Sequence, residues 1–218
     1  MPGTAIFDLD KTITREGTWS RFVRFATDQT AFWTKLPAAG LQAAIYKLGF
    51  ASRGSVKEKA IALYLQGRSK DELQALAADF VTRDISYGLR RRASSVIKKH
   101  QDQGDRLIIA SAAVDLICEP MAEALGFHDV ICTRLSWDSE DRLLPILDGA
   151  NCYGPEKLRR VDRYFKEQHL DRPATFYSDH ITDLPCLLWA DHGVAVNPNR
   201  PLHRKAPEYG VDVVDWDA

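Results

Sequence analysis

Two acidic side chains separated by one residue are the feature of this chain that most directly indicates chemistry. Asp8 and Asp10 follow the apolar run 5–7, which has the character of a buried strand, and Thr12 comes two residues later. Residues two apart leave a strand on the same side, so the two carboxylates are expected to lie close together. Like charges at that separation raise each other's pKa unless a cation lies between them. The pattern therefore predicts a site for a hard divalent metal at the carboxyl end of a strand, where open α/β sheets bind ligands.

Three further segments carry polar side chains at the ends of predicted strands or at the start of a helix. Ser111 follows one apolar run, Asp179 and Asp183 follow another, and Lys157 comes early in a predicted helix. If the strands are parallel and adjacent, the strand-end groups meet at one edge of the sheet. Together they offer carboxylates for a metal, hydroxyls for phosphate oxygens and one ammonium. Such a set suits phosphoryl transfer, in which positioning and charge neutralisation supply most of the catalysis.

Each of these residues also has a purely structural interpretation. Ser111, Asp179 and Asp183 are residue types that cap helices, and a single Lys157 on a helix is usually solvated. Separate structural roles do not explain why the four segments occur in this order along one chain. The two interpretations are also compatible, because helix N-termini bind phosphate.

The elements that must position these groups alternate between strand and helix from residue 86 onward. Such alternation predicts parallel βαβ units with right-handed crossovers. The expected fold class is α/β, with a Rossmann-like three-layer core that has helices on both sides of a parallel sheet. We expect strands at 5–7, 107–110, 130–132, 174–177, 193–196 and 211–214, a hairpin within 135–147, and helices at 87–100, 116–125, 156–169 and 183–190.

The chain between residues 15 and 86 has a helical pattern and few residues that favour strands. Ser55 with Glu58 and Ser69 with Glu72 are spaced as capping boxes that begin two helices. Pro37 suits the first turn of another helix. The sequence therefore predicts a helical insert after the first strand.

Composition narrows the class of protein. The 218 residues are 45% hydrophobic with a formal net charge of -1, which gives no global electrostatic footprint for nucleic acid. Four cysteines are far apart without a C-x-x-C pair, as expected for reduced, buried thiols in the cytosol. No apolar h-region follows Met1, so we expect no signal peptide and a cytoplasmic location. The sequence does not indicate the oligomeric state.

The segment 36–50 is the most apolar long stretch of the chain. It is shorter than the ~20 residues that a membrane-spanning helix needs, and its apolar residues follow helical spacing. Two interpretations stay open, a soluble amphipathic helix and an interfacial contact with a membrane.

Phe7-Asp8-Leu9-Asp10-Lys11-Thr12 resembles the first motif of the haloacid dehalogenase (HAD) superfamily of phosphatases. Ser111, Lys157 and the segment Ser178-Asp179-x-x-x-Asp183 resemble its second, third and fourth motifs, in the same order. The helical insert between the first two motifs resembles the C1-type cap of subfamily IB, which includes phosphoserine phosphatase. The resemblance covers nearly the whole chain. It implies a catalytic core formed by residues 1–14 and 87–218 and a cap domain formed by residues 15–86.

The resemblance also implies a role for each motif residue. Asp8 would be the nucleophile that forms an aspartyl-phosphate, and Asp10 would protonate the leaving alcohol and then activate water. The implied cofactor is Mg2+, and His180 is expected to line the site without binding this oxygen-preferring ion. By the same resemblance, phosphate would be bound by Thr12, Ser111, Ala112 and Lys157, and Lys157 would also take part in catalysis. Mg2+ would be held by Asp8, Asp179 and the backbone carbonyl of Asp10. Asp183 would support the metal's water shell or Lys157.

The predicted cap is expected to select the substrate, with Glu16, Trp19 and Arg53 as candidate specificity residues. Basic cap residues would suit an anionic substrate. Phosphoserine phosphatases typically have two glycines after the serine of the second motif, where this chain has Ala112 and Ala113. This difference leaves the nucleophile and the acid in place and puts phosphoserine in doubt as the substrate.

The leading functional prediction is a Mg2+-dependent phosphomonoesterase that acts on a phosphorylated small metabolite. The first alternative is a phosphatase of a lipid phosphate such as phosphatidylglycerol phosphate, the one case in which membrane contact is expected. Alternatives of another class are a phospho-receiver that uses Asp8 as the acceptor and a non-catalytic interaction protein on the same fold. Asp10 argues against a receiver, because a resident acid and base would shorten the life of a phosphoaspartate.

Overall fold

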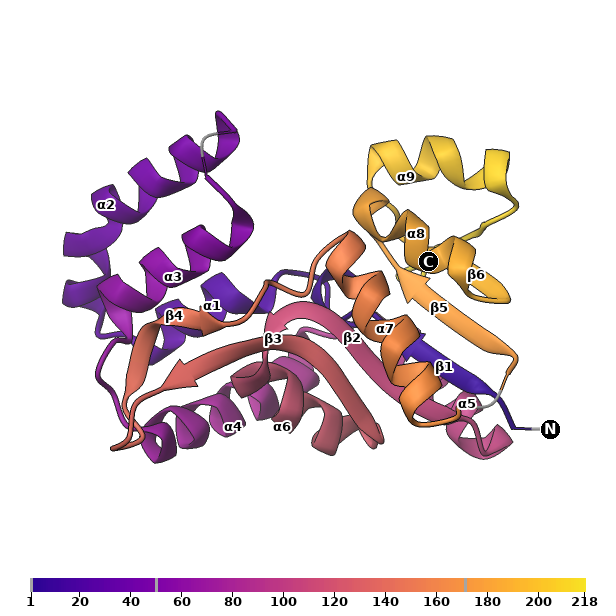
Figure 1. The fold of residues 1–218 in the computed structure, drawn as a ribbon, viewed down its shortest axis with the longest axis horizontal. Helices are drawn as coiled ribbons and strands as arrows, with labels where there is room; N and C mark the ends of the chain where they lie inside the picture. The colour runs from indigo at the N-terminus through magenta and orange to yellow at the C-terminus, as the bar shows by residue number, and fades with distance from the viewer. Residues whose placement is uncertain (1, 50, 171) are drawn as a thin grey trace.

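A seven-stranded sheet forms the centre of the protein (Figure 1). The structure is a computed structural model and describes residues 2–49, 51–170 and 172–218, except the side chains at 42–44, 46 and 47. The strand order is β4-β3-β2-β1-β5-β6-β7, and β4 pairs antiparallel with β3 while the other pairs are parallel. The Rossmann-like α/β expectation and the hairpin are thereby confirmed. The strands are β1 (Thr4–Phe7), β2 (Arg106–Val114), β3 (Asp129–Trp137), β4 (Leu143–Asp148), β5 (Ala174–Ser178), β6 (His192–Val196) and β7 (Asp212–Val214).

Side chains that alternate along the central strands build a hydrophobic core on each face of the sheet. Phe7 and Ile109 belong to one buried cluster, whereas Ile6 and Ile108 belong to the other. The first cluster includes residues of α5 (Ala93–Gln103) and α6 (Asp115–Leu125), and the second includes residues of α7 (Pro155–Glu167), α8 (Leu184–Trp189) and α9 (Arg200–Lys205). The result is the expected three-layer arrangement, with β1 in the middle of the sheet.

The chain between β1 and α5 forms the helices α1 (Thr18–Ala26), α2 (Gln29–Lys47), α3 (Arg53–Tyr64) and α4 (Lys70–Tyr87). Its two ends lie side by side, because Thr14 forms an antiparallel bridge with Leu89 and Arg15 N donates to Gly88 O at 2.8 Å. This juxtaposition is what an insert requires, and the division into core and cap domains itself stays a prediction.

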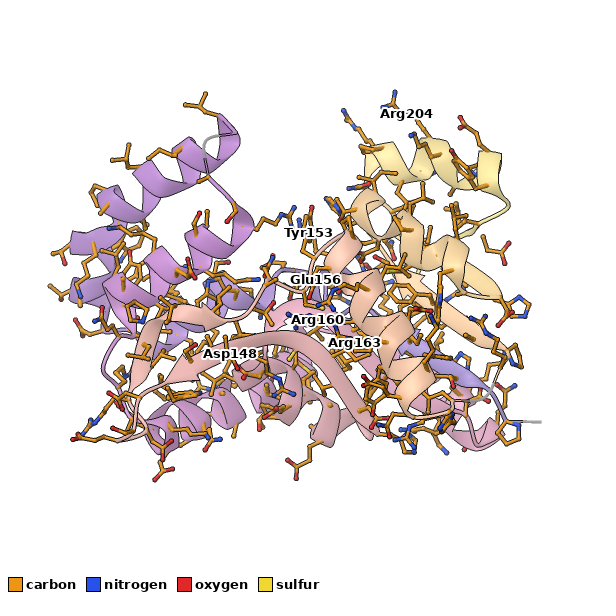
Figure 2. All side chains as sticks on the ribbon, viewed as in Figure 1. Asp148, Tyr153, Glu156, Arg160, Arg163 and Arg204 are labelled. Atoms are coloured by element: carbon orange, nitrogen blue, oxygen red, sulfur yellow. The ribbon has the colours of Figure 1, made fainter. Side chains whose placement is uncertain are left out.

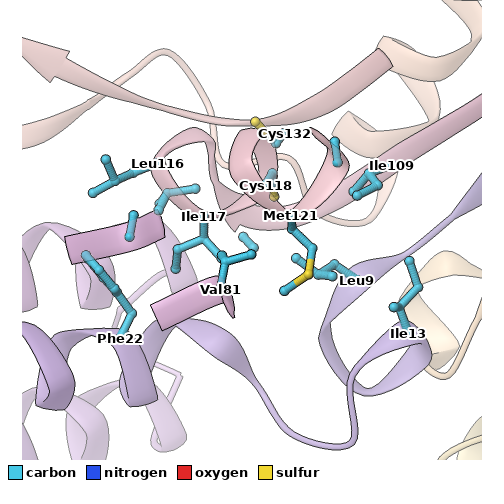
Figure 3. Packing of buried hydrophobic residues seen from close by; sticks show 14 of the residues in the cluster. Leu9, Ile13, Phe22, Val81, Ile109, Leu116, Ile117, Cys118, Met121 and Cys132 are labelled. Atoms are coloured by element: carbon cyan, nitrogen blue, oxygen red, sulfur yellow. The ribbon is translucent and has the colours of Figure 1, made fainter. Parts of the chain in front are cut away.

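The inserted helices share a hydrophobic core with the helix layer under the sheet. Phe22 of α1 and Val81 of α4 belong to the same buried cluster as Ile117 and Met121 of α6 (Figure 3). In Figure 1, α4 lies beside α6, while α2 and α3 lie further out. This packing ties α1 and α4 to the core.

Two expected helix starts in this region were wrong. Helix α3 is capped by Ser52, because its hydroxyl accepts from Ser55 N at 3.0 Å and the Ser55 hydroxyl accepts from Ser52 N at 3.1 Å. Ser55 therefore occupies the N3 position of this capping box, where we had expected it to be the N-cap. Ser69 does cap α4 as predicted, since its hydroxyl accepts from Glu72 N.

Pro37 lies in the interior of α2, so the prediction that it occupies a first turn was also wrong. The helix begins earlier because the Asp28 carboxylate accepts the amide protons of Thr30 and Ala31 at 2.9 and 3.1 Å. The last residue of the apolar segment 36–50, Phe50, lies outside the described residues. No described helix combines the length and the apolar character needed to cross a membrane.

The predicted helix 87–100 was wrong at its start, because α4 continues to Tyr87 and ends at Gly88. A Cβ at Gly88 would lie 2.3 Å from Oδ1 of Asp84, so a residue with a side chain does not fit there without a shift. The chain then pairs with the segment after β1 before α5 begins at Ala93.

Candidate active site

Asp8 and Asp10 follow β1 directly, in a tight turn at the carboxyl edge of the sheet. The Asp8 amide donates to Tyr177 O at 2.9 Å, which continues the pairing between β1 and β5 by one residue. Lys11 has a φ of 65°, in the left-handed region, so the chain reverses direction within this turn. Both Asp8 and Asp10 line one cavity.

Lys157 forms the charged centre of this site. Helix α7 begins at Pro155, which puts Lys157 in its first turn. The Lys157 ammonium donates to Asp8 Oδ1 at 3.0 Å and to Asp183 Oδ2 at 2.6 Å, and Ser178 Oγ donates to the same Asp183 oxygen at 2.8 Å. All four side chains are buried. Burial opposes the charged form of Lys157, but the charges of Asp183 and Asp8 raise its pKa well above the usual range.

Four carboxyl groups, those of Asp8, Asp10, Asp179 and Asp183, line the cavity around the Lys157 ammonium. Burial raises the pKa of Asp8 to about 6, against the lowering effect of Lys157. Burial and the charges of Asp8 and Asp183 raise the pKa of Asp179 to about 7. Within the described part of the chain, Asp183 Oδ1 is buried without a hydrogen-bond partner. Repelling buried carboxylates and an unpaired oxygen are the features that a divalent cation would relieve.

The donor set fits Mg2+ better than a transition metal. Among the residues that the structure describes, no group of three or more His, Cys, Asp or Glu side chains is arranged to hold a metal. Mg2+ does not need such a group, because it keeps several waters and is held by one or two carboxylates plus substrate phosphate. Asp8 and Asp179 provide that pair of carboxylates.

The Asp10 carboxyl group is held by the first residue of α1. Its Oδ1 accepts from Thr18 N at 2.8 Å and from Thr18 Oγ1 at 2.7 Å. Burial raises the pKa of Asp10, although the Thr18 hydrogen bonds act in the opposite direction. The other oxygen, Oδ2, lies beside Gly17, where an added Cβ would be 3.9 Å away. A side chain at this position would only make an ordinary van der Waals contact with Oδ2, and both Asp10 and Gly17 line the cavity.

The cavity has a volume of about 240 Å³ and brings most of the predicted site residues together. Its lining residues come from β2, α7, the segments that follow β1, β4 and β5, and the inserted helix α3. They are Asp8, Asp10, Lys11, Gly17, Arg53, Ser111, Ala112, Tyr153, Lys157, Asp179, His180, Thr182 and Asp183. His180 thus lies where the sequence predicted.

Three predicted site residues do not line this cavity. Thr12 follows the left-handed turn at Lys11 and is fully buried, and its hydroxyl has no hydrogen-bond partner among the described residues. Glu16 is exposed, and its Oε2 lies 3.8 Å from Nε of Arg21. Trp19 packs against Phe22, with ring centroids 6.4 Å apart. The structure therefore does not support a phosphate contact for Thr12 or a substrate contact for Glu16 and Trp19.

Tyr153 is a cavity residue that the sequence did not indicate. The Arg53 guanidinium carbon lies 4.0 Å from the centroid of the Tyr153 ring, so a residue of α3 stacks on a residue of the core. Figure 2 shows Tyr153 beside the start of α7, on the side of the inserted helices. The one available signal in the sequence was that Tyr153 precedes Gly154 and Pro155. Glycine and proline at these positions indicate the start of a helix and do not indicate substrate binding.

Sequence comparison relates the chain to a family of hydrolases. The model of the haloacid dehalogenase-like hydrolase family matches residues 5–188. Protein CicA of Caulobacter vibrioides is 29% identical over 191 residues, which cover 87% of this chain and 84% of CicA. A histidinol-phosphatase of Neisseria meningitidis is 27% identical over 152 residues, which cover 68% of each chain.

Solved structures share the fold. A protein of unknown function from Bordetella pertussis Tohama I superimposes with a TM-score of 0.85 at 24% identity, covering 99% of both chains. A substrate-bound phosphoserine phosphatase superimposes with a TM-score of 0.70 at 15% identity, covering 100% of this chain and 94% of that one. At these identities the likeness concerns the fold alone.

Proposed function

Because the chain belongs to the haloacid dehalogenase-like hydrolase family, we propose that it is a Mg2+-dependent phosphatase of a phosphorylated small metabolite. The observation that carries this proposal is the buried group Asp8, Lys157 and Asp183 in a cavity that Asp10 and Ser111 also line. The cavity thereby holds a proposed nucleophile, Asp8, a fixed cation, Lys157, and a proposed acid, Asp10.

Asp8 is the proposed nucleophile. Lys157 engages its Oδ1, which leaves Oδ2 to attack phosphorus. The new bond joins Asp8 to phosphorus, and the bond from phosphorus to the ester oxygen breaks. Lys157 and the Ser111 hydroxyl neutralise and orient the phosphate oxygens.

Asp10 is the proposed acid and base. Thr18 fixes its Oδ1, so Oδ2 carries the proton that passes to the leaving alcohol oxygen. The raised pKa of Asp10 favours the protonated form that this first step needs. The resulting carboxylate then takes a proton from water as the water attacks phosphorus, which releases orthophosphate and restores Asp8.

Mg2+ would be held by the carboxylates of Asp8 and Asp179 and by the backbone carbonyl of Asp10. When bound, it supplies positive charge to the phosphate oxygens and to the crowded carboxylates. Asp183 would keep Lys157 in place, since the two are paired at 2.6 Å.

The cavity favours a small phosphomonoester with a second polar or anionic group. Its volume of about 240 Å³ lies below the ~300–1,000 Å³ that is typical of sites for drug-sized ligands, so it suits a small ester. Arg53 lines the cavity and stacks on Tyr153, which together offer a cation and an aromatic surface to the rest of the substrate. The histidinol-phosphatase relative acts on a small phosphate ester by its name, and we carry over that substrate class only.

A lipid phosphate is the second candidate substrate. The observation in its favour is the apolar surface of the cap, where Trp33 is 57% exposed, Leu41 65% and Leu48 70%. Such side chains suit contact with a membrane surface. The predicted cytoplasmic location agrees with either substrate and stays a prediction.

Release of orthophosphate from a substrate panel tests the proposal. The panel contains phosphoserine, histidinol phosphate, sugar phosphates and phosphatidylglycerol phosphate in vesicles, each with Mg2+ or with a chelator. We expect Mg2+-dependent release from at least one soluble ester and none from Asp8→Asn. Activity that survives Asp8→Asn or ignores the chelator would contradict the proposal, and activity confined to the vesicles would favour the second candidate. A phosphoaspartate that persists for many minutes without turnover would instead indicate a receiver.

A further inference from the structure

Lys57 is a buried lysine of α3 that points out of the cap and into the core. It is 9% exposed, and its ammonium donates to Ala112 O at 2.5 Å and to Asn151 Oδ1. Lysine is rarely buried without such partners. Both partners belong to the core, since Ala112 lies in β2 and Asn151 lies in the loop between β4 and α7. Lys57 therefore joins the inserted helices to the catalytic edge of the sheet.

The Ala112 carbonyl, which accepts a hydrogen bond from Lys57, is linked through one peptide group to Ser111 in the predicted phosphate site. Ala112 O belongs to the same peptide group as Ala113 N, and Ala113 N donates to Ser111 Oγ at 3.2 Å. A cation on the carbonyl polarises this peptide and strengthens its N–H as a donor. Because Ser111 Oγ accepts from Ala113, its own proton is available for a phosphate oxygen in the cavity.

The surroundings of Lys57 hold this path in one geometry. Thr133 Oγ1 lies 2.9 Å from Ala112 O and 3.0 Å from Asn151 Oδ1, and it accepts from Cys152 N at 3.0 Å. Thr133 of β3 therefore contacts the same two acceptors as Lys57, and the loop before α7 holds Thr133 through the Cys152 amide. Arg53, one turn earlier on α3, lines the cavity, so any movement of this helix affects both residues.

We propose that Lys57 is a positioning residue that couples the docking of α3 onto the core to phosphate binding by Ser111. The inference rests on the proposed function, because it concerns the same cavity. It assigns Lys57 no contact with the substrate, since Lys57 does not line the cavity and acts through the peptide between Ala112 and Ala113.

The charge of Lys57 is also expected to change near neutral pH. Burial lowers its pKa to about 8, although Asp10 favours the charged form. The other groups that face it are Arg53, Cys118 and Cys152. Burial raises the pKa of Cys118 well above its usual range and that of Cys152 to about 12, so neither thiol ionises near pH 8. The charge of Lys57 is therefore expected to change between about pH 7 and about pH 9.

Calorimetric titration of orthophosphate in the presence of Mg2+ tests the inference. In the wild-type protein we expect affinity to weaken several-fold from about pH 7 to about pH 9. Lys57→Met is expected to bind orthophosphate ~10-fold or more weakly at the lower pH. A loss of this size is typical when a residue that orients a ligand-binding group is removed. Lys57→Arg stays charged, so it is expected to restore binding and to remove the alkaline weakening. Lys59→Met, on the exposed side of the same helix, is the control that should match wild type.

Thermal unfolding of each variant shows whether a weak titration reflects loss of the fold. Equal affinity in Lys57→Met and wild type would overturn the inference, as would an alkaline change in affinity that is the same in Lys57→Arg and wild type. The second comparison does not need Lys57→Met to fold, and it cancels the titrations that both proteins share, those of Asp179 and of orthophosphate itself. A wild-type protein that binds orthophosphate but releases none from any ester would overturn the proposed function, and the comparison of Lys57 variants would still decide this inference.

Discussion

The Lys157 ammonium lies 3.0 Å from Oδ1 of Asp8, and both groups are buried. A buried ion pair is held less by its own attraction than by the surrounding hydrogen bonds, because removing two charges from water is costly. Asp183 and Ser178 supply those hydrogen bonds here. Asp8, the proposed nucleophile, is therefore fixed in position by groups from β5, α7 and the loop that follows β5.

Removal of the central cation is expected to affect both stability and activity. Lys157→Met leaves Asp8 and Asp183 buried without a counter-charge, so we expect a loss of ~3 kcal/mol or more in the free energy of unfolding. We also expect a ~100-fold or greater loss in kcat, because an aligned charge at the phosphate is removed. Chemical denaturation and steady-state kinetics measure the two effects.

Lys166→Met on the same helix is the matched control. Lys166 pairs with Asp162 at the surface, where its side chain is 74% exposed. Loss of an exposed pair is expected to change the free energy of unfolding by ~0.5 kcal/mol or less. If both variants lost the same stability, the buried pair would have no special role.

The stability gained from Mg2+ is expected to depend on pH. Asp8 and Asp179 have pKa values raised to about 6 and about 7, so the folded protein holds their protons more tightly than the unfolded chain does. The contribution of these two groups to stability without metal is then greatest below the unfolded pKa of about 4 and is lost as the pH rises through about 7. Mg2+ competes with these protons, so its effect on Tm is expected to be larger at about pH 8 than at about pH 5.5.

Thermal unfolding of chelator-treated protein, with and without Mg2+, gives this difference directly. Asp179→Asn removes one proposed ligand and is expected to reduce the Mg2+ effect at the higher pH. An increase in Tm that is the same at both pH values would mean that Mg2+ does not bind at these carboxylates.

Loss of the proposed acid is expected to depend on the leaving group. Asp10→Asn keeps the Thr18 contact at Oδ1 but cannot transfer a proton, so kcat for alkyl phosphates is expected to fall ~100-fold or more. The rate of phosphorylation by para-nitrophenyl phosphate should fall less, because its leaving group needs little protonation. Rapid-mixing measurement of the first turnover compares the two substrates. Equal losses would contradict the role of Asp10 as the acid.

Two cap residues proposed from the sequence are expected to behave differently. Arg53 lines the cavity and Glu16 does not. Arg53→Ala is expected to raise KM ~10-fold for esters with a second anionic group, as when a charged hydrogen bond is lost. Glu16→Ala is expected to leave KM unchanged. Comparison of phosphoserine with glycerol phosphate as substrates measures the effect, and a loss shared equally by both esters would count against Arg53 as a specificity residue.

The core of the site was predictable because short apolar runs fix where the strands end. Asp8 and Asp179 follow adjacent parallel strands, and such ends meet at one edge of the sheet whatever the loops do. Lys157 was predictable from its place after Gly154 and Pro155, which start a helix.

The cap and the turn residues were not predictable in the same way. The inward direction of Thr12 depends on the left-handed conformation of Lys11, and non-glycine residues rarely indicate such a conformation in a sequence. The start of α3 depends on which of two serines caps it, and both Ser52 and Ser55 suit that position. Tyr153 and Lys57 meet the site through contacts between the insert and the core, which local sequence patterns do not encode.

Trapping of the covalent intermediate tests the central claim most directly. The protein is mixed with para-nitrophenyl phosphate and Mg2+, quenched within the first turnovers and reduced with borohydride, which converts an aspartyl-phosphate to homoserine. We predict homoserine in place of Asp8 in the peptide analysed by mass spectrometry, and unmodified aspartate at Asp10, Asp179 and Asp183. Steady release of orthophosphate with no modification at Asp8, or with modification at another carboxylate, would contradict the account.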